Sequence, residues 1–252
     1  MTSLSHMESK IEASLAVKTA EEIHSLCSEL CQALGFDYFL YWLQFPTSFV
    51  NPEYVIISGF PEDWWTHYNT QGYMTIDPTV LHCTTGVVPL KWDEINPDKS
   101  GAGKRVRNFM SEAWDFGLRS GASFPVHGSN GEAAIFSLVS DQHNTNARSH
   151  VLEHLAIGQL LSGYVHEAVR RVIVDAEGPI PKVQLTERER ECLTCAAEGK
   201  TAWEAAQILT ISERTVIFHL QNAAQKLQVT NRPQAVARAV SQQLITPQLG
   251  RN

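Results

Sequence analysis

A short segment rich in proline and glycine does most to limit how this chain can fold. Residues 175–183 read DAEGPIPKV, and two prolines and a glycine within nine residues disfavour both helix and strand. The sequence therefore predicts two domains, at residues 1–174 and 184–252, with this segment as the linker between them. The length of 252 residues is sufficient for two domains of ordinary size.

The sign of the charge changes at the same segment. Residues 182–252 contain nine lysines and arginines against six acidic residues, whereas residues 1–181 contain 11 against 21. From Arg214 to the end of the chain there are five basic residues and no acidic residue. This asymmetry indicates that only the C-terminal domain contacts a polyanion.

Periodicity predicts a mixed α/β fold for the N-terminal domain. Strands are expected where aromatic and β-branched residues cluster, and helices where apolar residues recur every three or four positions. The expected strands are residues 36–45, 54–60, 87–92, 122–127 and 133–140. The expected helices are one that begins at Thr19, after a capping box with Glu22, and three more at residues 61–72, 104–116 and 147–174. Helices that cover a central sheet on both faces give an α-β-α sandwich.

The C-terminal domain shows four short helical segments and no strand pattern. Polar caps at Thr186, Thr201, Ser212 and Asn231 indicate the four helix starts, and Gly199 stands where the first helix should end. The short joint between the first two helices is typical of a helix-turn-helix. We therefore expect an all-α helix-turn-helix domain here.

The third of these helices has two different sides. One side is apolar and is expected to pack inward: Val216, Leu220, Ala223 and Leu227. The opposite side would enter the major groove of DNA, where Ile217 or Phe218 would touch a thymine methyl and Gln221 would pair with adenine. The expected DNA contacts, in which the cations hold phosphates, are Lys200, Thr201, Arg214, Thr215, Ile217, Phe218, Gln221, Asn222, Lys226 and Arg232. The alternative is a small helical bundle with a solvated basic face.

The C-terminal domain resembles the LuxR-type DNA-binding domain. The resemblance rests on LTERERECL at residues 185–193, AEGKT at 197–201 and ISERTV at 211–216. It implies that the domain binds DNA through its third helix. Relatives commonly have a polar residue where this chain has Ile217, so their preferred DNA sequence is not carried over to this chain.

Residues 60–83 resemble the autoinducer-binding domain of LuxR-type quorum-sensing receptors. The motif W-x3-Y-x8-DP is present as Trp64, Tyr68, Asp77 and Pro78, and Trp92 continues the match. The resemblance implies an N-acyl homoserine lactone as the ligand, no cofactor, and a homodimer on a pseudo-palindromic site in double-stranded DNA. RNA polymerase is a further candidate partner of such a transcription factor.

The chemistry of these residues suits a lactone of this class. A buried Asp77 carboxylate can accept from the amide N–H, and the Trp64 indole can donate to the lactone carbonyl. The hydroxyls of Tyr68 and Ser137 can bond the acyl carbonyl. The expected ligand site is Phe60, Trp64, Trp65, Tyr68, Tyr73, Asp77, Thr79, Val80, Trp92, Phe109, Trp114, Leu118, Ser123 and Ser137. Taken singly, each of these residues is more often part of a core, a turn or a helix cap.

Two positions in this set depart from the family pattern. Relatives often carry Tyr where this chain has Phe60, and some carry Arg where it has Trp65. Both changes make the site less polar. We therefore expect weaker selection for ligands with a 3-oxo group on the acyl chain.

Other residue patterns favour no further chemistry. Cys192 and Cys195 have the spacing of a redox or zinc pair, but no second pair or nearby histidine completes a metal site. Five cysteines at scattered positions indicate reduced thiols, and no apolar stretch predicts a signal peptide or a membrane span. We therefore expect a cytoplasmic protein that does not bind a membrane.

Three alternative functions stay open from the sequence. One is a receptor of the same fold that answers a non-lactone signal, and the second is a DNA-binding protein whose N-terminal half serves only as a dimerisation scaffold. DNA binding that survives Asp77→Asn unchanged would favour either of these. The third is an enzyme, for which we find no credible catalytic set; turnover of a lactone would favour it.

Overall fold

The computed structural model describes residues 11–46, 52–99, 103–128, 131–174 and 183–246. The chain divides into two compact units, one formed mainly before residue 180 and one mainly after it, here called the N-terminal and C-terminal units. The predicted linker at 175–183 lies outside the described residues except for Val183, so its boundaries stay a prediction. In the described part of the chain, no helix is long and apolar enough to cross a membrane.

A five-stranded sheet forms the centre of the N-terminal unit. Its strand order is β2-β1-β5-β4-β3, and β1–β5, β5–β4 and β4–β3 are antiparallel pairs. The strands are β1 (Tyr38–Phe45), β2 (Glu53–Ser58), β3 (Leu90–Lys91), β4 (Ser120–His127) and β5 (Ala133–Ser140). The register places Leu40 of β1 and Ser123 of β4 on either side of Ser137 in β5. These three residues therefore lie in one row across the sheet.

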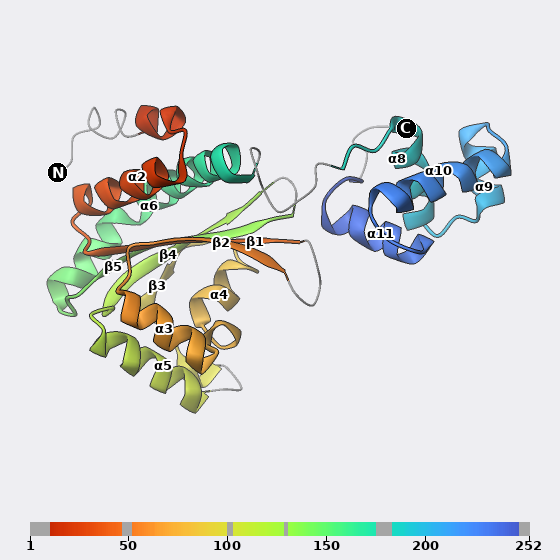
Figure 1. Cartoon of the computed structure of the whole chain (residues 1–252). Coiled ribbons are helices and arrows are strands. Elements are labelled where there is room, and N and C mark those ends of the chain that lie inside the picture. The colour runs from red at the N-terminus through yellow and green to blue at the C-terminus, as the bar shows by residue number, and fades with distance from the viewer. Residues whose placement is uncertain (1–10, 47–51, 100–102, 129–130, 175–182, 247–252) are drawn as a thin grey trace. The chain divides into compact units, whose positions relative to one another are not determined.

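Helices α2 (Ala20–Ala33) and α6 (Thr145–Val169) cover one face of this sheet (Figure 1). The predicted cap of α2 is confirmed, because the Thr19 hydroxyl accepts from the Glu22 N–H. The Glu22 carboxylate accepts from the N–H of Lys18, so the expected capping box is not closed. Helix α6 ends earlier than predicted and continues as a π-helical turn, η4 (Arg170–Val174).

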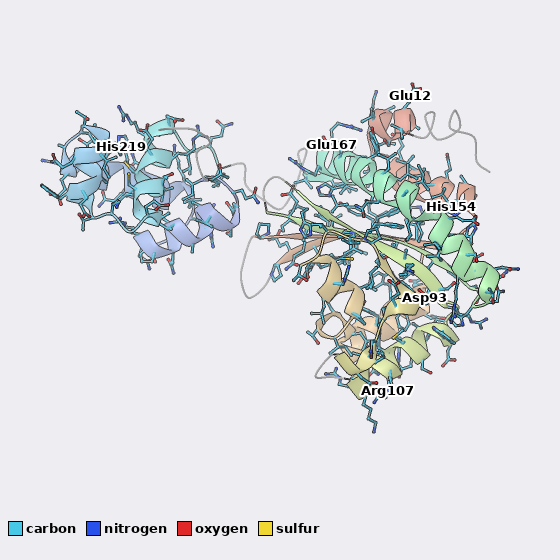
Figure 2. All side chains as sticks on the ribbon, turned by 180° about the vertical axis from the view of Figure 1, so that it is seen from behind. Glu12, Asp93, Arg107, His154, Glu167 and His219 are labelled. Atoms are coloured by element: carbon cyan, nitrogen blue, oxygen red, sulfur yellow. The ribbon has the colours of Figure 1, made fainter. Side chains whose placement is uncertain are left out.

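The other face carries α3 (Glu62–Gln71), α4 (Pro78–Cys83) and α5 (Gly103–Asp115), as Figure 1 shows. Helix α3 ends at Gly72, whose left-handed backbone (φ 63°) suits a residue without a side chain. Three 3₁₀ turns connect these elements: η1 (Tyr73–Thr75), η2 (Trp92–Glu94) and η3 (Pro97–Lys99). The side chains of this region are drawn in Figure 2, where Arg107 marks α5 and Asp93 marks η2.

The sequence prediction was wrong in two places on this face. Strand β3 is only two residues long, because Pro89 lacks the N–H that a longer ladder would need and Trp92 begins a 3₁₀ turn. Helix α4 was not predicted, because six residues are too few to show a helical period.

Between residues 183 and 246, the C-terminal unit contains the four predicted helices. They are α8 (Glu187–Ala197), α9 (Ala202–Leu209), α10 (Glu213–Lys226) and α11 (Arg232–Ser241). All four predicted caps are confirmed, and Thr186 and Thr201 each form a complete capping box with the glutamate three residues later. The predicted inward side of α10 is confirmed as well, since Val216, Leu220, Ala223 and Leu227 are buried in the core of this unit.

Candidate functional site

A cavity of about 210 Å³ lies on the face of the sheet that carries α3 and α5. Leu40 and Ser137 form its floor on the central strands, and side chains from α3, α5 and η2 form its walls. Eleven of the fourteen residues predicted for the ligand site line it: Phe60, Trp64, Trp65, Tyr68, Asp77, Thr79, Trp92, Phe109, Trp114, Leu118 and Ser137. Residues from five separate stretches of the chain thus meet at one apolar cavity.

Asp77 is the buried carboxylate of this cavity and also the N-cap of α4. One carboxylate oxygen accepts from the N–H and the hydroxyl of Thr79, at 2.8 and 2.7 Å, and the other accepts from the hydroxyl of Tyr68 at 3.1 Å. Burial raises the pKa of Asp77, and these hydrogen bonds oppose the rise. Asp77 therefore both caps α4 and lines the cavity, and its role in ligand binding stays a prediction.

Tyr68 makes a different hydrogen bond from the one expected. Its hydroxyl donates to Asp77, whereas the sequence suggested an acyl carbonyl as the partner. Burial, followed by the charge of Asp77, raises the pKa of Tyr68, so the hydroxyl stays protonated and remains a donor. In this structure Tyr68 thus orients the carboxylate, and its expected bond to an acyl carbonyl stays a prediction.

Ser123 does not line the cavity but holds two residues that do. Its hydroxyl lies 2.8 Å from that of Ser137, and the Trp92 indole donates to it at 3.0 Å. Ser123 is fully buried. This chain of hydrogen bonds fixes the Trp92 ring against the sheet and leaves the Ser137 side chain at the cavity floor.

The structure does not bring Tyr73 or Val80 into the cavity lining. Tyr73 stands in η1, where its hydroxyl donates to Glu112 of α5 at 2.5 Å and its ring packs against Trp64 and Phe109, two residues that do line the cavity. Val80 lies one position after Thr79 on α4 and packs instead against a group formed by Trp42, Cys83 and Ile135.

Sequence reasoning missed the remaining residues of the lining. They are Leu40, Asp93, Ile95, Met110, Ala113, Arg119, His143 and Arg148. Alternation along the predicted strand could have found Leu40, and the period of α5 could have found Met110 and Ala113. His143 and Arg148 follow β5 and carry no comparable signal; His143 packs against Trp114 with ring centroids 4.4 Å apart.

A polar contact outside the cavity ties α3 to α5. The Glu112 carboxylate, which accepts from Tyr73, also lies 2.6 Å from the His67 ring nitrogen. The bonds from His67 and Tyr73 lower the pKa of Glu112, which keeps it ionised. Because Trp64 and Phe109 stand on these two helices with ring centroids 5.8 Å apart, the contact helps to fix the distance between opposite walls of the cavity.

The C-terminal unit exposes the side of α10 that was expected to meet DNA. Ile217 and Phe218 are 43% and 55% exposed, and Arg214 and Gln221 are also exposed. This exposed side of α10 is the one that the sequence analysis expects to enter the major groove.

Two of the expected phosphate contacts have partners within the protein. The Lys226 ammonium lies 2.7 Å from the buried Glu189 carboxylate and donates to the backbone carbonyl of Gln184 at 3.1 Å. The Arg232 guanidinium donates to the backbone carbonyl of Lys200. Lys226 therefore joins α10 to α8. Arg232 stands with Lys200 and Thr201 around one hollow at the N-terminal ends of α9 and α11.

Comparison with known proteins identifies both units. The family of autoinducer binding domains matches residues 19–169, and the luxR family of bacterial regulatory proteins matches residues 183–239. The chain belongs to the LuxR-type quorum-sensing transcriptional regulators. It is therefore a DNA-binding regulator with an autoinducer-binding domain and is not an enzyme.

This LuxR-type regulator is similar over its length to curated relatives. It is 33% identical to the transcriptional activator protein AnoR of Acinetobacter nosocomialis, over 94% of this chain and 97% of that protein. It is 39% identical to the quorum sensing-dependent transcriptional regulator RpaR of Rhodopseudomonas palustris, over 77% and 76% of the two chains. Among solved structures, SdiA in complex with octanoyl-rac-glycerol is 25% identical and covers 97% of each chain, with a TM-score of 0.77.

Proposed function

We propose that this LuxR-type regulator binds an N-acyl homoserine lactone in the cavity and, as a homodimer, a pseudo-palindromic DNA site. The observation that carries the proposal is the Asp77 carboxylate, buried in an apolar cavity and fixed by Thr79 and Tyr68. The proposed site of action is the cytoplasm, where the DNA lies.

The Asp77 carboxylate already accepts hydrogen bonds within the protein and can share an oxygen with one amide donor. An ionised carboxylate offers about four lone-pair positions. Three of them accept from Thr79 and Tyr68, and the backbone N–H of Val80 also acts on this carboxylate, so the amide N–H of the ligand would share an oxygen that already accepts from the protein. A bond from an N–H to an ionised carboxylate is about twice as strong as a neutral one.

The rest of the cavity suits the other groups of such a ligand. No described residue accepts a hydrogen bond from the Trp64 indole N–H, which is available for the lactone carbonyl. Ser137 offers a hydroxyl to the acyl carbonyl, and Phe60 and Trp65 present apolar rings with centroids 6.5 Å apart. An apolar cavity with a few fixed polar groups is the usual form of a small-molecule site.

A second candidate is a receptor for a non-lactone acyl compound. The similar structure of SdiA contains octanoyl-rac-glycerol, an acyl ester without a lactone ring. This ligand offers hydroxyl donors in place of the amide N–H. The two candidates therefore differ in what Asp77 accepts.

Extraction of the bound ligand tests the proposal. The full chain is expressed with a mixed panel of acyl homoserine lactones and octanoylglycerol, and organic extracts are analysed by mass spectrometry beside Asp77→Asn. Asparagine caps a helix about as well as aspartate, so α4 should persist in the variant while the charge is lost. We expect the wild type to enrich a lactone and the variant to lose it.

Asp93→Asn is the matched control, because Asp93 also lines the cavity but is exposed. We expect it to retain the ligand. Enrichment of octanoylglycerol alone would support the second candidate, and no enrichment by folded wild-type protein would reject both. Within the panel, a 3-oxo lactone that binds about tenfold better than its unsubstituted match would contradict the expected weak selection for that group.

The proposed dimer and DNA site rest on exposed side chains. Leu152 and Leu160 on α6 are 60% and 48% exposed, and Ala156 lies between them at the same helical spacing. Such a stripe suits a second copy of this chain, and two copies would place two α10 helices on one site. Selection of DNA from a random duplex pool should yield a two-fold symmetric site; a single half-site would contradict the dimer. RNA polymerase is proposed as a further partner of the DNA-bound regulator.

A further inference from the structure

We propose that Trp42 closes the cavity along the sheet and thereby sets the upper limit on the acyl chain of the ligand. This inference rests on the proposed function, because it concerns the same cavity and the same class of ligand. It predicts a residue outside the predicted ligand site that decides which members of the class bind.

Trp42 stands on the same face of the sheet as the cavity floor. Trp42 follows Leu40 by two residues in β1, so both side chains stand on the same face. In β5, Leu40 pairs with Ser137 and Trp42 pairs with Ile135. Because Leu40 and Ser137 form the cavity floor, Trp42 and Ile135 are the next pair along that floor.

The space beyond the cavity is filled at this point. Trp42, Ile135 and Cys83 are 3%, 2% and 0% exposed, and Val80 packs against them. Val80 and Cys83 stand on α4, whose Thr79 lines the cavity. The sheet and α4 thus both lead from the cavity toward the indole ring, which lies behind the residues that line the cavity. The ring of Tyr54 packs against Trp42 with centroids 5.4 Å apart.

The indole N–H of Trp42 is buried and has no hydrogen-bond partner among the described residues. A buried donor without an acceptor is unfavourable. The presence of a tryptophan at position 42 is therefore explained by the size of its ring and not by a hydrogen bond from its N–H. A smaller side chain would join the space of the ring to the cavity.

The consequence for the ligand follows from the apolar character of this group. An acyl chain that extends along the cavity floor meets the indole ring. The further methylenes of a longer chain then find no buried apolar space. Each methylene that gains a buried position contributes about fourfold to affinity. Removal of the ring should therefore favour longer chains by about fourfold for each methylene that the new space accepts.

The experiment compares chain-length profiles. Wild type, Trp42→Ala, Trp42→Leu and Trp42→Phe are each expressed as full chains with an equimolar series of unsubstituted lactones from butanoyl to dodecanoyl, and the extracted ligands are quantified. We expect a shift toward longer chains in Trp42→Ala, a smaller shift in Trp42→Leu, and the wild-type profile in Trp42→Phe, which keeps most of the bulk. Circular dichroism of each purified variant checks the fold, and Trp42→Leu remains informative if Trp42→Ala does not fold.

Each outcome decides the inference. Wild-type profiles in both Trp42→Ala and Trp42→Leu would overturn it while leaving the proposed function intact. Loss of the preferred ligand in folded Trp42→Phe would also overturn it, because the N–H and not the bulk would then select the ligand. Extraction of no lactone by the wild type or by any variant is a different failure, since it rejects the proposed function itself.

Discussion

Replacement of Lys226 by alanine should destabilise the C-terminal unit rather than merely weaken DNA binding. Sequence reasoning placed Lys226 among the phosphate contacts, but its ammonium lies 2.7 Å from the Glu189 carboxylate. The side chain of Glu189 is 4% exposed and that of Lys226 is 39% exposed. The variant therefore leaves a buried carboxylate without its cation.

The exposure of the two partners bounds the size of the effect. Loss of one partner of a fully buried ion pair costs about 3–5 kcal/mol, whereas an exposed pair contributes about 0–1 kcal/mol. Because water reaches the ammonium but not the carboxylate, we expect a loss of about 2 kcal/mol in the free energy of unfolding, within the range for hydrogen bonds to charged groups.

The same pair should make this loss depend on pH. Burial alone would raise the pKa of Glu189, but the bonds from Lys226 and the Thr186 N–H outweigh burial and hold the pKa below its ordinary value. A lowered pKa stabilises the fold above the pKa of the unfolded chain, and this stability is lost as the pH falls through the folded value. The difference between wild type and variant should therefore be complete at neutral pH and shrink in acid.

Hydrogen–deuterium exchange of the full chain measures the effect locally, in peptides from α8 and α10. Lys226→Arg should exchange like the wild type, and so should Lys200→Ala, which removes an exposed lysine without an ion pair in the described structure. Unchanged exchange in Lys226→Ala, together with weaker DNA binding and a salt dependence reduced by about one phosphate contact, would refute this reasoning and restore the original prediction.

Three further predictions concern other parts of the chain. A Cβ at Gly158 would lie 2.2 Å from the Phe124 ring, so Gly158→Ala should lower the urea midpoint by an amount equivalent to about 2 kcal/mol. The control Gly163→Ala, with nothing within 4 Å of the new Cβ, should raise the free energy of unfolding by about 0.5–1 kcal/mol, and equal effects of the two variants would contradict the packing of α6. Thr210 ends α9 in the left-handed region (φ 55°), so Thr210→Gly should raise the free energy of unfolding of the C-terminal unit by about 1 kcal/mol; a lower urea midpoint would argue against strain there. Because burial raises the pKa of Asp77, a ligand that donates to its carboxylate should bind less tightly as the pH falls through that raised value, and titrations should find no such trend in Asp77→Asn.

Much of the fold could be predicted from the sequence where the signal is local. The caps at Thr186 and Thr201 are short-range hydrogen-bonding patterns, and both form as expected. Gly72 likewise ends α3 as predicted. Helix α4 and the short β3 escaped prediction, because an element of a few residues depends on its tertiary neighbours more than on its own period.

In the cavity, too, the features set by nearby residues were predicted and those set by residues far along the chain were not. The motif that contains Trp64, Tyr68 and Asp77 carried the resemblance to autoinducer-binding domains, which implied that these side chains share one site, and all three line the cavity. The hydroxyl of Tyr73 found a partner on α5, which no spacing within residues 60–83 could reveal. Lys226 was assigned from its charge alone, and its partner Glu189 lies 37 positions earlier in the chain.

The double role of Asp77 limits how this receptor could change its ligand by mutation. The side chain that faces the cavity also begins α4, so a replacement must still accept a hydrogen bond from the Thr79 N–H. Only asparagine, serine and threonine do so with comparable geometry. Few viable substitutions are therefore open at the polar centre of the cavity. Ligand preference would change instead through the apolar walls, whose described residues cap no helix.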